Sequence, residues 1–248
     1  EGHYHAFRVE NEDLEDAVKG MRALGIQGFN VTVPHKVSIM KHLDRIDESA
    51  EALGAVNTVR REKEGLVGYN TDGAGFLKSL KPSLDRPLSE LSILLIGAGG
   101  AARAIFTALA AETPKRLDVA NRTPEKALAF TQRFDGEARA LSLQEAEADL
   151  SAYDIVIQTT SVGMHPNVEA APLSLANAKE TCLVCDIIYN PLKTALLHEA
   201  EAKGLKTLDG VGMFIGQAAL AFELWTGHEP NMEKMKSIVL QQLGGKSC

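Results

Sequence analysis

The sequence predicts an α/β protein with two domains, and two observations support that prediction. From residue 93 onward, short apolar runs alternate regularly with helical patterns, which indicates a parallel sheet covered by helices on both faces. Before that point strand and helix patterns are mixed, and a polar, proline-containing segment over residues 81–90 separates the two regions. We therefore expect a larger domain over residues 81–212 and a smaller α/β domain over residues 1–80, with a cleft between them.

The smaller domain shows both the helical spacing and the strand-like alternation of apolar residues. Apolar residues recur at helical spacing before Gly25, a typical helix stop, and Pro34 ends an alternating strand pattern. The turn around Gly65 separates two strand-like runs, which predicts a hairpin. The expected elements are a strand over 3–9, a helix over 12–24, a strand over 29–33 with a short helix after it, a hairpin of 55–61 and 66–70, and a helix over 72–80.

The larger domain repeats one simple unit, a strand followed by a helix. The expected strands cover 93–96, 117–120, 155–158 and 183–188, and the expected helices cover 101–109, 124–134 and 194–202. After residue 208 the chain reads as helix to its end. These last helices need a surface to cover, so we expect residues 213–248 to return and pack on the smaller domain.

Composition excludes several classes of protein. The 248 residues carry a net charge of −7, which repels the phosphate backbone of nucleic acid, and mean hydropathy is −0.08. No apolar stretch approaches the about 20 residues that span a bilayer. Cys182 and Cys185 lie in an apolar run that reads as a strand, where their spacing sends them to opposite faces. We expect core cysteines in a cytoplasmic protein, with no metal site.

A glycine-rich turn follows the first strand of the larger domain. The run Gly97, Ala98, Gly99, Gly100 and Ala101 joins a strand to a helix, and its glycines let a pyrophosphate approach the backbone. The exposed N–H groups and the dipole of the helix would stabilise the diphosphate. Many glycine clusters are only turns, but this position between strand and helix predicts a Rossmann-type dinucleotide site.

The end of the next strand indicates which dinucleotide binds. NAD sites present an acidic residue there for the ribose 2′-hydroxyl, whereas this chain has Asn121, Arg122 and Thr123, with Lys126 shortly after. A guanidinium, a hydroxyl and a second cation suit a 2′-phosphate, which predicts NADP. The alternative is a helix cap at Thr123 before a proline, which would leave Arg122 unexplained.

Polar residues at strand ends mark the candidate reactive site. Thr32 lies on the strand that ends before Lys36, and Asp72 lies at a strand-to-helix junction. Asn57 interrupts an apolar strand and needs a hydrogen-bond partner. Oxidation of an alcohol by hydride transfer also requires removal of the hydroxyl proton, which a Lys36–Asp72 pair could provide. A solvated lysine and an N-cap aspartate are the alternatives.

Seven motifs follow one another along the chain: N-V-T-V-P-H-K (30–36), A-V-N-T (55–58), N-T-D-G-A-G (70–75), G-A-G-G-A-A-R (97–103), N-R-T-P-E-K (121–126), T-T-S-V-G-M (159–164) and D-G-V-G-M-F-I-G-Q (209–217). In type and order they resemble those of a known family, the shikimate dehydrogenases, and the resemblance runs along the whole chain. Members reversibly reduce 3-dehydroshikimate to shikimate with NADPH, in the pathway to aromatic amino acids and chorismate.

The resemblance implies roles for the matching residues. Lys36 would be the catalytic acid/base and Asp72 its partner, both touching the substrate hydroxyls. Further substrate contacts would come from Thr32, Asn57 and Gln217, with Tyr189 close by. Gln217 is also a polar residue inside an apolar helix, where an amide bonded to nearby backbone is an equal alternative.

The same resemblance places other residues at the cofactor. Met213 would pack near the nicotinamide and Ile187 against the cofactor, while Thr160 and Gly210 would lie along it. Glu48 would lie at the edge of the cleft. The expected small molecules are therefore NADP and shikimate or 3-dehydroshikimate, with no nucleic acid and no membrane as partner.

The chain departs from the family pattern at its start. Members begin with a further strand and a Ser-x-Ser segment that grips the substrate carboxylate, and the sequence from Glu1 contains neither. We therefore expect this chain, as given, to bind NADP but to turn over shikimate poorly. Two alternatives stay open: a quinate/shikimate dehydrogenase that uses NAD, and a catalytically inactive NADP-binding regulator. A homodimer is also left open.

Overall fold

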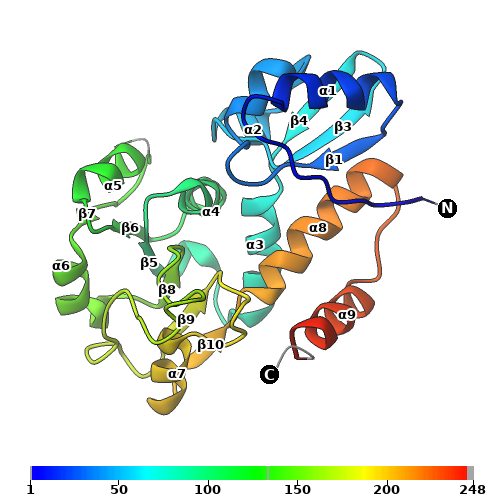
Figure 1. Cartoon of the computed structure of the whole chain (residues 1–248). Coiled ribbons are helices and arrows are strands. Elements are labelled where there is room, and N and C mark those ends of the chain that lie inside the picture. Colours follow the sequence, from blue (N-terminus) through cyan, green and yellow to red (C-terminus); the bar gives the residue numbers. More distant parts are fainter. Residues whose placement is uncertain (1, 133, 245–248) are drawn as a thin grey trace. The chain divides into compact units, whose positions relative to one another are not determined.

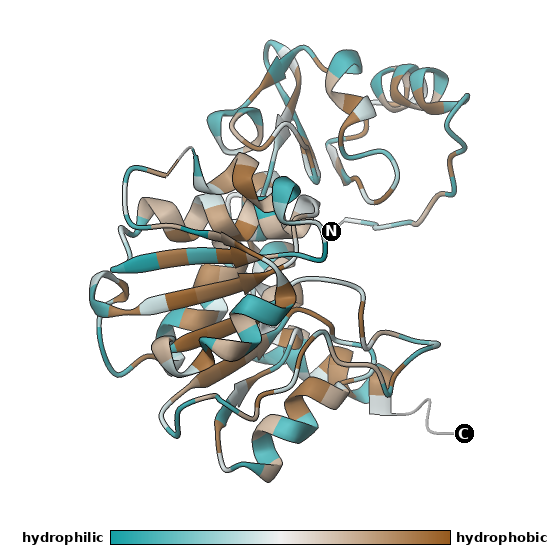
Figure 2. Ribbon diagram, turned by 90° about the vertical axis from the view of Figure 1, so that its left-hand side faces the viewer, coloured by the Kyte–Doolittle hydropathy of each residue, from teal (hydrophilic) through white to brown (hydrophobic). Residues whose placement is uncertain are grey.

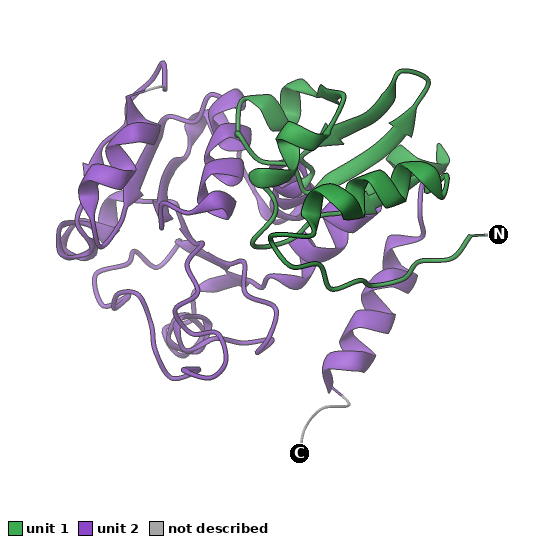
Figure 3. Ribbon diagram, turned by 45° about the horizontal axis from the view of Figure 1, so that its top comes forward, with its two compact units in different colours: residues 1–71, 221–227 green, residues 72–220, 228–248 purple. Residues whose placement is uncertain are grey.

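A computed structural model describes residues 2–132 and 134–244, and the chain divides into two compact units (Figure 3). Unit 1 holds residues 1–71 and 221–227, and unit 2 holds residues 72–220 and 228–248. The domain boundaries predicted from the sequence run differently, because they assign residues 72–80 and the whole segment 213–248 to the first domain. Those domain boundaries stay a prediction.

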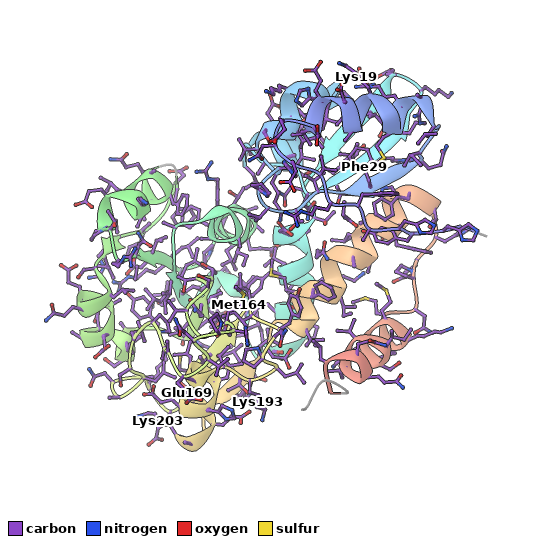
Figure 4. All side chains as sticks on the ribbon, in the orientation of Figure 1. Lys19, Phe29, Met164, Glu169, Lys193 and Lys203 are labelled. Carbon is purple, nitrogen blue, oxygen red and sulfur yellow. The ribbon has the colours of Figure 1, made fainter. Side chains whose placement is uncertain are left out.

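Unit 1 is built on a four-stranded mixed sheet in the order β1-β3-β4-β2. The predicted hairpin is confirmed, since β3 and β4 pair antiparallel around Gly65, whose φ of 127° requires glycine. Phe29, on β1, packs against the apolar cluster of this unit (Figure 4). The elements are α1 (Leu14–Ala23), β1 (Gly28–Asn30), η1 (Ser38–His42), β2 (Arg45–Ile46), α2 (Glu48–Glu51), β3 (Thr58–Glu62) and β4 (Gly65–Tyr69).

The predicted strand over residues 3–9 is wrong. Residues 2–10 form neither helix nor strand, and most of their side chains are exposed. The Tyr4 hydroxyl donates to Asn30 Oδ1 at 2.8 Å, and the Val9 carbonyl lies 2.8 Å from His35 Nε2. These contacts hold the segment through side chains. Alternation of apolar and polar residues indicated extended backbone, but a strand also needs a ladder of backbone hydrogen bonds with a neighbour.

Unit 2 contains a six-stranded parallel sheet with the strand order β10-β9-β8-β5-β6-β7 (Figure 1). Numbered along the unit, this is the doubly wound 3-2-1-4-5-6 order of dinucleotide-binding folds. The predicted α/β class and its parallel sheet are therefore confirmed. The strands are β5 (Ser92–Ile96), β6 (Arg116–Ala120), β7 (Ala140–Leu141), β8 (Ile155–Gln158), β9 (Leu183–Asp186) and β10 (Lys206–Leu208).

Helices cover both faces of this sheet, and alternate residues of β5 enter the two separate cores. Strands β5, β8 and β9 are mostly apolar and buried on both faces, and Figure 2 shows the hydrophobic colour on much of the sheet. One face packs against helices α3 (Asp72–Leu80), α4 (Gly100–Ala111), α5 (Pro124–Thr131) and α8 (Val211–Thr226). The other face packs against α6 (Leu143–Ala148) and α7 (Ala195–Ala202). Short 3-10 turns are η2 (Lys81–Ser83), η3 (Leu88–Glu90) and η4 (Leu150–Ala152).

The two cysteines behave as core residues. Cys182 and Cys185 are free, fully buried and members of opposite apolar clusters, as their odd spacing predicts. Burial raises the pKa of the Cys182 thiol to about 11 and raises that of Cys185 well above its usual value. Both thiols therefore stay protonated at neutral pH, which disfavours a redox role.

The chain's last helices behave differently from each other. The end of α8 returns to unit 1, where Trp225 Nε1 donates to the Val59 carbonyl at 2.9 Å. Residues 221–227 thus belong to unit 1, and the return of the whole segment 213–248 stays a prediction. Helix α9 (Met232–Gly244) belongs to unit 2 and buries none of its described residues. Over the ranges that the structure describes, no helix is both long enough and apolar enough to cross a membrane.

Candidate functional site

The glycine turn between β5 and α4 has the geometry that the sequence predicts. Gly97 has a φ of 114°, and a side chain there would collide with the hydroxyl of Thr159 at 2.6 Å and the methyl of Thr160 at 2.9 Å. Only glycine suits this position. The turn that follows β8 is thereby packed directly against the turn that follows β5.

The next two glycines leave room for a ligand. A Cβ on Gly99 or Gly100 would meet no atom within 4 Å, and both residues are exposed at the start of the 12-residue helix α4. Free N–H groups at a helix N-terminus favour anions. This open cradle fits a pyrophosphate, with Ala98 and Ala101 as its small neighbours.

The segment after β6 begins helix α5 as the helix-cap interpretation expects, with Thr123 as the N-cap residue and Pro124 following it. The Thr123 side chain makes no capping hydrogen bond. Asn121 Nδ2 instead donates to the Thr123 carbonyl at 2.8 Å, which closes the segment into a turn. Arg122 and Lys126 are both exposed, and the helix start does not explain them. Their contact with a 2′-phosphate stays a prediction.

The other cofactor candidates of unit 2 lie in the loops after β8, β9 and β10 and in the first turn of α8. Thr160 lies against Gly97, as described above. Gly210 packs so closely on the Ile187 carbonyl that a side chain there has no space, and its N–H donates to the Ile188 carbonyl at 3.2 Å. Met213 is buried in the first turn of α8. Met164 is half-exposed in the long loop after β8 (Figure 4).

In unit 1, backbone contacts gather three of the predicted substrate residues. The Val56 N–H donates to the Lys36 carbonyl at 2.7 Å, and the Val31 N–H donates to the Asn57 carbonyl at 2.8 Å. Thr32 follows Val31 directly and is exposed. The Thr32–Lys36 segment therefore runs beside Asn57.

Asn57 has the partners that its buried position requires. Its Nδ2 donates to Thr71 Oγ1 at 3.0 Å, and its Oδ1 accepts from the Thr71 N–H at 2.9 Å and the Thr58 hydroxyl at 2.9 Å. Thr71 immediately precedes Asp72. Asn57 thus fixes the chain at the point where it leaves unit 1.

The remaining substrate candidates lie in unit 2. Asp72 is the buried first residue of α3, and Gln217 lies on α8. These helices touch through their backbones, because a Cβ on Gly75 would lie 2.5 Å from the Gln217 nitrogen. The Gln217 amide donates to the Phe214 carbonyl at 3.0 Å, the alternative that the sequence left open. Tyr189 is 38% exposed and packs on the Phe214 ring, with 4.5 Å between ring centroids.

Lys36 and Glu48 belong to unit 1, whereas Asp72 and the other cofactor candidates belong to unit 2. Glu48 is the exposed first residue of α2. The contact between Lys36 and Asp72, and that between Glu48 and the cofactor, stay predictions.

Two buried polar residues escaped the sequence analysis, Gln158 at the end of β8 and Asp186 at the end of β9. The sequence contains a signal for both, because each is a polar residue at the end of an otherwise apolar strand. Both bond to the loops that follow them. Such residues at the carboxyl edge of a parallel sheet lie where ligands bind in this fold class.

Asp186 should make stability depend on pH in a predictable direction. Burial raises the pKa of its carboxyl to about 6, although hydrogen bonds from the Ile188 N–H and the Thr194 hydroxyl act to lower it. The folded protein therefore holds this proton to a higher pH than the unfolded chain does. The group's contribution is complete below about pH 4 and is lost as the pH rises through about 6.

Asp186→Asn removes this titration. We expect the free energy of unfolding of the variant, relative to wild type, to rise between about pH 4 and pH 6 and then to level off. Urea unfolding at a series of pH values measures that difference. A difference that falls or stays flat over the interval would contradict the raised pKa.

The parallel sheet of this order and the open glycine turn define a dinucleotide-binding protein of the Rossmann class. Three family models match the sequence, and together they cover most of it: "Shikimate dehydrogenase substrate binding domain" at residues 1–59, "Shikimate / quinate 5-dehydrogenase" at 80–193 and "Shikimate 5'-dehydrogenase C-terminal domain" at 210–240. The chain belongs to the shikimate dehydrogenase family.

Relatives agree with this assignment along the whole chain. The "Shikimate dehydrogenase (NADP(+))" of Bacillus subtilis is 66% identical over 100% of this chain and 89% of its own length. The Thermus thermophilus shikimate 5-dehydrogenase, solved with NADP(H) and shikimate, has a TM-score of 0.85 at 38% identity, over 96% of this chain and 87% of that one. A quinate dehydrogenase from Corynebacterium glutamicum, solved with NAD, has a TM-score of 0.85 at 32% identity, over 95% and 85%.

Proposed function

We propose that this chain is an NADP-dependent shikimate dehydrogenase that reversibly reduces 3-dehydroshikimate to shikimate, a step toward chorismate and the aromatic amino acids. The observation that carries the proposal is an open phosphate cradle at Gly99 and Gly100 combined with Arg122 after β6, in a chain 66% identical to a shikimate dehydrogenase named for NADP(+). The missing acidic residue at the end of β6 supports NADP over NAD.

The residues divide the work between the two units. In unit 2, the start of α4 binds the pyrophosphate, and residues 121–126 bind the 2′-phosphate. When bound, NADP supplies the hydride acceptor for the substrate carbon. In unit 1, Lys36 takes the hydroxyl proton during oxidation and returns it during reduction, while Thr32 and Asn57 orient the ring. Asp72, Gln217 and Tyr189 complete the substrate site.

Steady-state kinetics with four pairs of substrates test this proposal. Shikimate and quinate are each oxidised with NADP or NAD, and NADPH or NADH formation is followed by absorbance. We expect the highest kcat/KM for shikimate with NADP. A preference for NAD would favour the quinate/shikimate alternative, and no turnover of any pair would favour the inactive regulator.

Arg122 should determine the preference for NADP. Because a charge-assisted hydrogen bond contributes about 1.5–3 kcal/mol, Arg122→Ala should raise the KM for NADP by about 10- to 100-fold and leave that for NAD nearly unchanged. Lys115→Ala removes the same charge from an exposed position outside the turn and serves as the control. An equal rise in KM for NADP and for NAD would mean that Arg122 does not contact the 2′-phosphate.

Residence in the cytoplasm and assembly as a homodimer stay predictions of the sequence. Size-exclusion chromatography with light scattering measures the second directly.

A further inference from the structure

Two buried polar side chains end neighbouring strands of the parallel sheet, and we propose that they position the two loops that hold NADP. The residues are Gln158 on β8 and Asp186 on β9. This inference rests on the proposed function and adds to it two positioning residues that lie outside the family motifs described above. Neither would touch the cofactor; each acts through the backbone of the loop that follows it.

The two residues are register partners. Gln158 pairs with Asp186 in the parallel ladder of β8 and β9, which run side by side (Figure 1), and their exposed fractions are 0% and 2%. The Ile187 N–H continues the ladder by donating to the Gln158 carbonyl at 3.1 Å. Burying a polar side chain at the end of a strand is unfavourable unless hydrogen bonds compensate for the loss of water. The partners of these side chains therefore show what they stabilise.

Gln158 uses both ends of its amide on one loop. Its Oε1 accepts from the Thr160 N–H at 2.9 Å, and its Nε2 donates to the Val162 carbonyl at 2.9 Å. Thr159, which lies between Gln158 and Thr160, donates through its hydroxyl to the Ile96 carbonyl at 2.6 Å. These hydrogen bonds close the loop over the end of β8, where Thr159 and Thr160 contact Gly97. Thr160 is held beside the phosphate turn as a consequence.

Asp186 makes equivalent hydrogen bonds at the end of the next strand. One carboxylate oxygen accepts from the Ile188 N–H at 2.9 Å, again two residues further on, and the other accepts from the Thr194 hydroxyl at 2.7 Å. Ile188 in turn accepts from the Gly210 N–H, and Gly210 packs on Ile187. Asp186 therefore sets the backbone of Ile187 and the start of α8.

Together the two side chains fix a wall formed by Gly97, Thr160, Ile187 and Gly210, whose two halves follow the neighbouring strands β8 and β9. All four residues are packed by glycine contacts, Thr160 against Gly97 and Ile187 against Gly210, that leave little space for a shift toward each other. Without the hydrogen bonds of Gln158 or Asp186, the loop that follows would lose its fixed position in this wall. The expected consequence is weaker NADP binding, with the substrate residues of unit 1 unaffected.

Gln158→Leu and Asp186→Leu test the proposal, because leucine occupies similar space without hydrogen-bonding groups. We expect the Kd of NADP⁺, measured by isothermal titration calorimetry, to rise by about 10- to 100-fold in each variant, as the loss of two buried hydrogen bonds implies. With saturating NADP, the KM for shikimate should stay within about twofold of wild type. Asp186→Asn, which keeps an acceptor for the Ile188 N–H, should restore most of the affinity.

Gln144→Leu, on the exposed face of α6, is the matched control and should bind NADP⁺ as wild type does. Leucine variants that bind NADP⁺ with wild-type Kd but unfold more easily would overturn the proposal, since the residues would then be structural only. If Gln158→Leu does not fold, Gln158→Met removes the same donor and acceptor from an unbranched side chain of similar length, and gives the same test. A wild-type chain that fails to bind NADP⁺ would instead overturn the proposed function.

Discussion

Replacing Lys36 by alanine should reduce kcat for shikimate oxidation by about 10²- to 10⁴-fold, the range that general acid–base groups contribute. The residue lies in unit 1, in a half-buried position, and its carbonyl is bonded to the residue before Asn57. The cradle for NADP is built from unit 2 alone. The Kd of NADP⁺ should therefore stay close to that of wild type, which separates a chemical loss from a binding loss.

Lys41→Ala is the matched control, because Lys41 is an exposed lysine of the same unit, on η1. It should leave kcat unchanged. Unchanged turnover in Lys36→Ala would remove this lysine from the mechanism, and a parallel loss of NADP⁺ affinity would place it at the cofactor instead.

The second large effect concerns stability. The Asp118 side chain, within β6, is fully buried and accepts hydrogen bonds from the Arg139 N–H at 2.8 Å and the Tyr153 hydroxyl at 2.6 Å. Arg116 Nη2 lies 2.6 Å from it and Arg139 Nε 3.1 Å. Removal of the carboxylate leaves the buried Tyr153 hydroxyl and the Arg139 N–H without this acceptor, while Arg116 and Arg139 still pair with Asp149. Asp118→Ala should therefore lower the free energy of unfolding by about 3–5 kcal/mol.

Urea unfolding followed by far-ultraviolet circular dichroism measures this loss. The control is Asp85→Ala, since the ion pair of Asp85 with Lys206 is exposed and should contribute little. A loss for Asp118→Ala no larger than that of the control would show that the cluster does not stabilise unit 2.

The sequence predicted unit 2 more accurately than unit 1 for a physical reason. The strands β5, β8 and β9 at the centre of the parallel sheet are buried on both faces, so their apolar runs are nearly continuous and easily located. In unit 1 the strands are short and partly exposed. The extended segment at residues 2–10 shows the limit, because local alternation carries no information about whether a ladder partner exists.

Site residues were predictable where local geometry demands a residue type. Gly97 is required by its φ, and Arg122 stood out because helix capping could not explain it. Gln158 and Asp186 could not be assigned, because their role depends on two strands being neighbours in register. That pairing joins residues 28 positions apart, which no single-strand pattern reveals. Asp118 was likewise recognised only as an acid inside a strand.

We propose that hydride passes directly between shikimate and NADP while Lys36 transfers the proton of the substrate hydroxyl. The most direct measurement uses shikimate carrying deuterium on the carbon that is oxidised, with mass spectrometry of the NADPH formed by the wild-type chain. Direct hydride transfer places one deuterium in each NADPH and none in the solvent. Unlabelled NADPH, with the deuterium released to water, would contradict it.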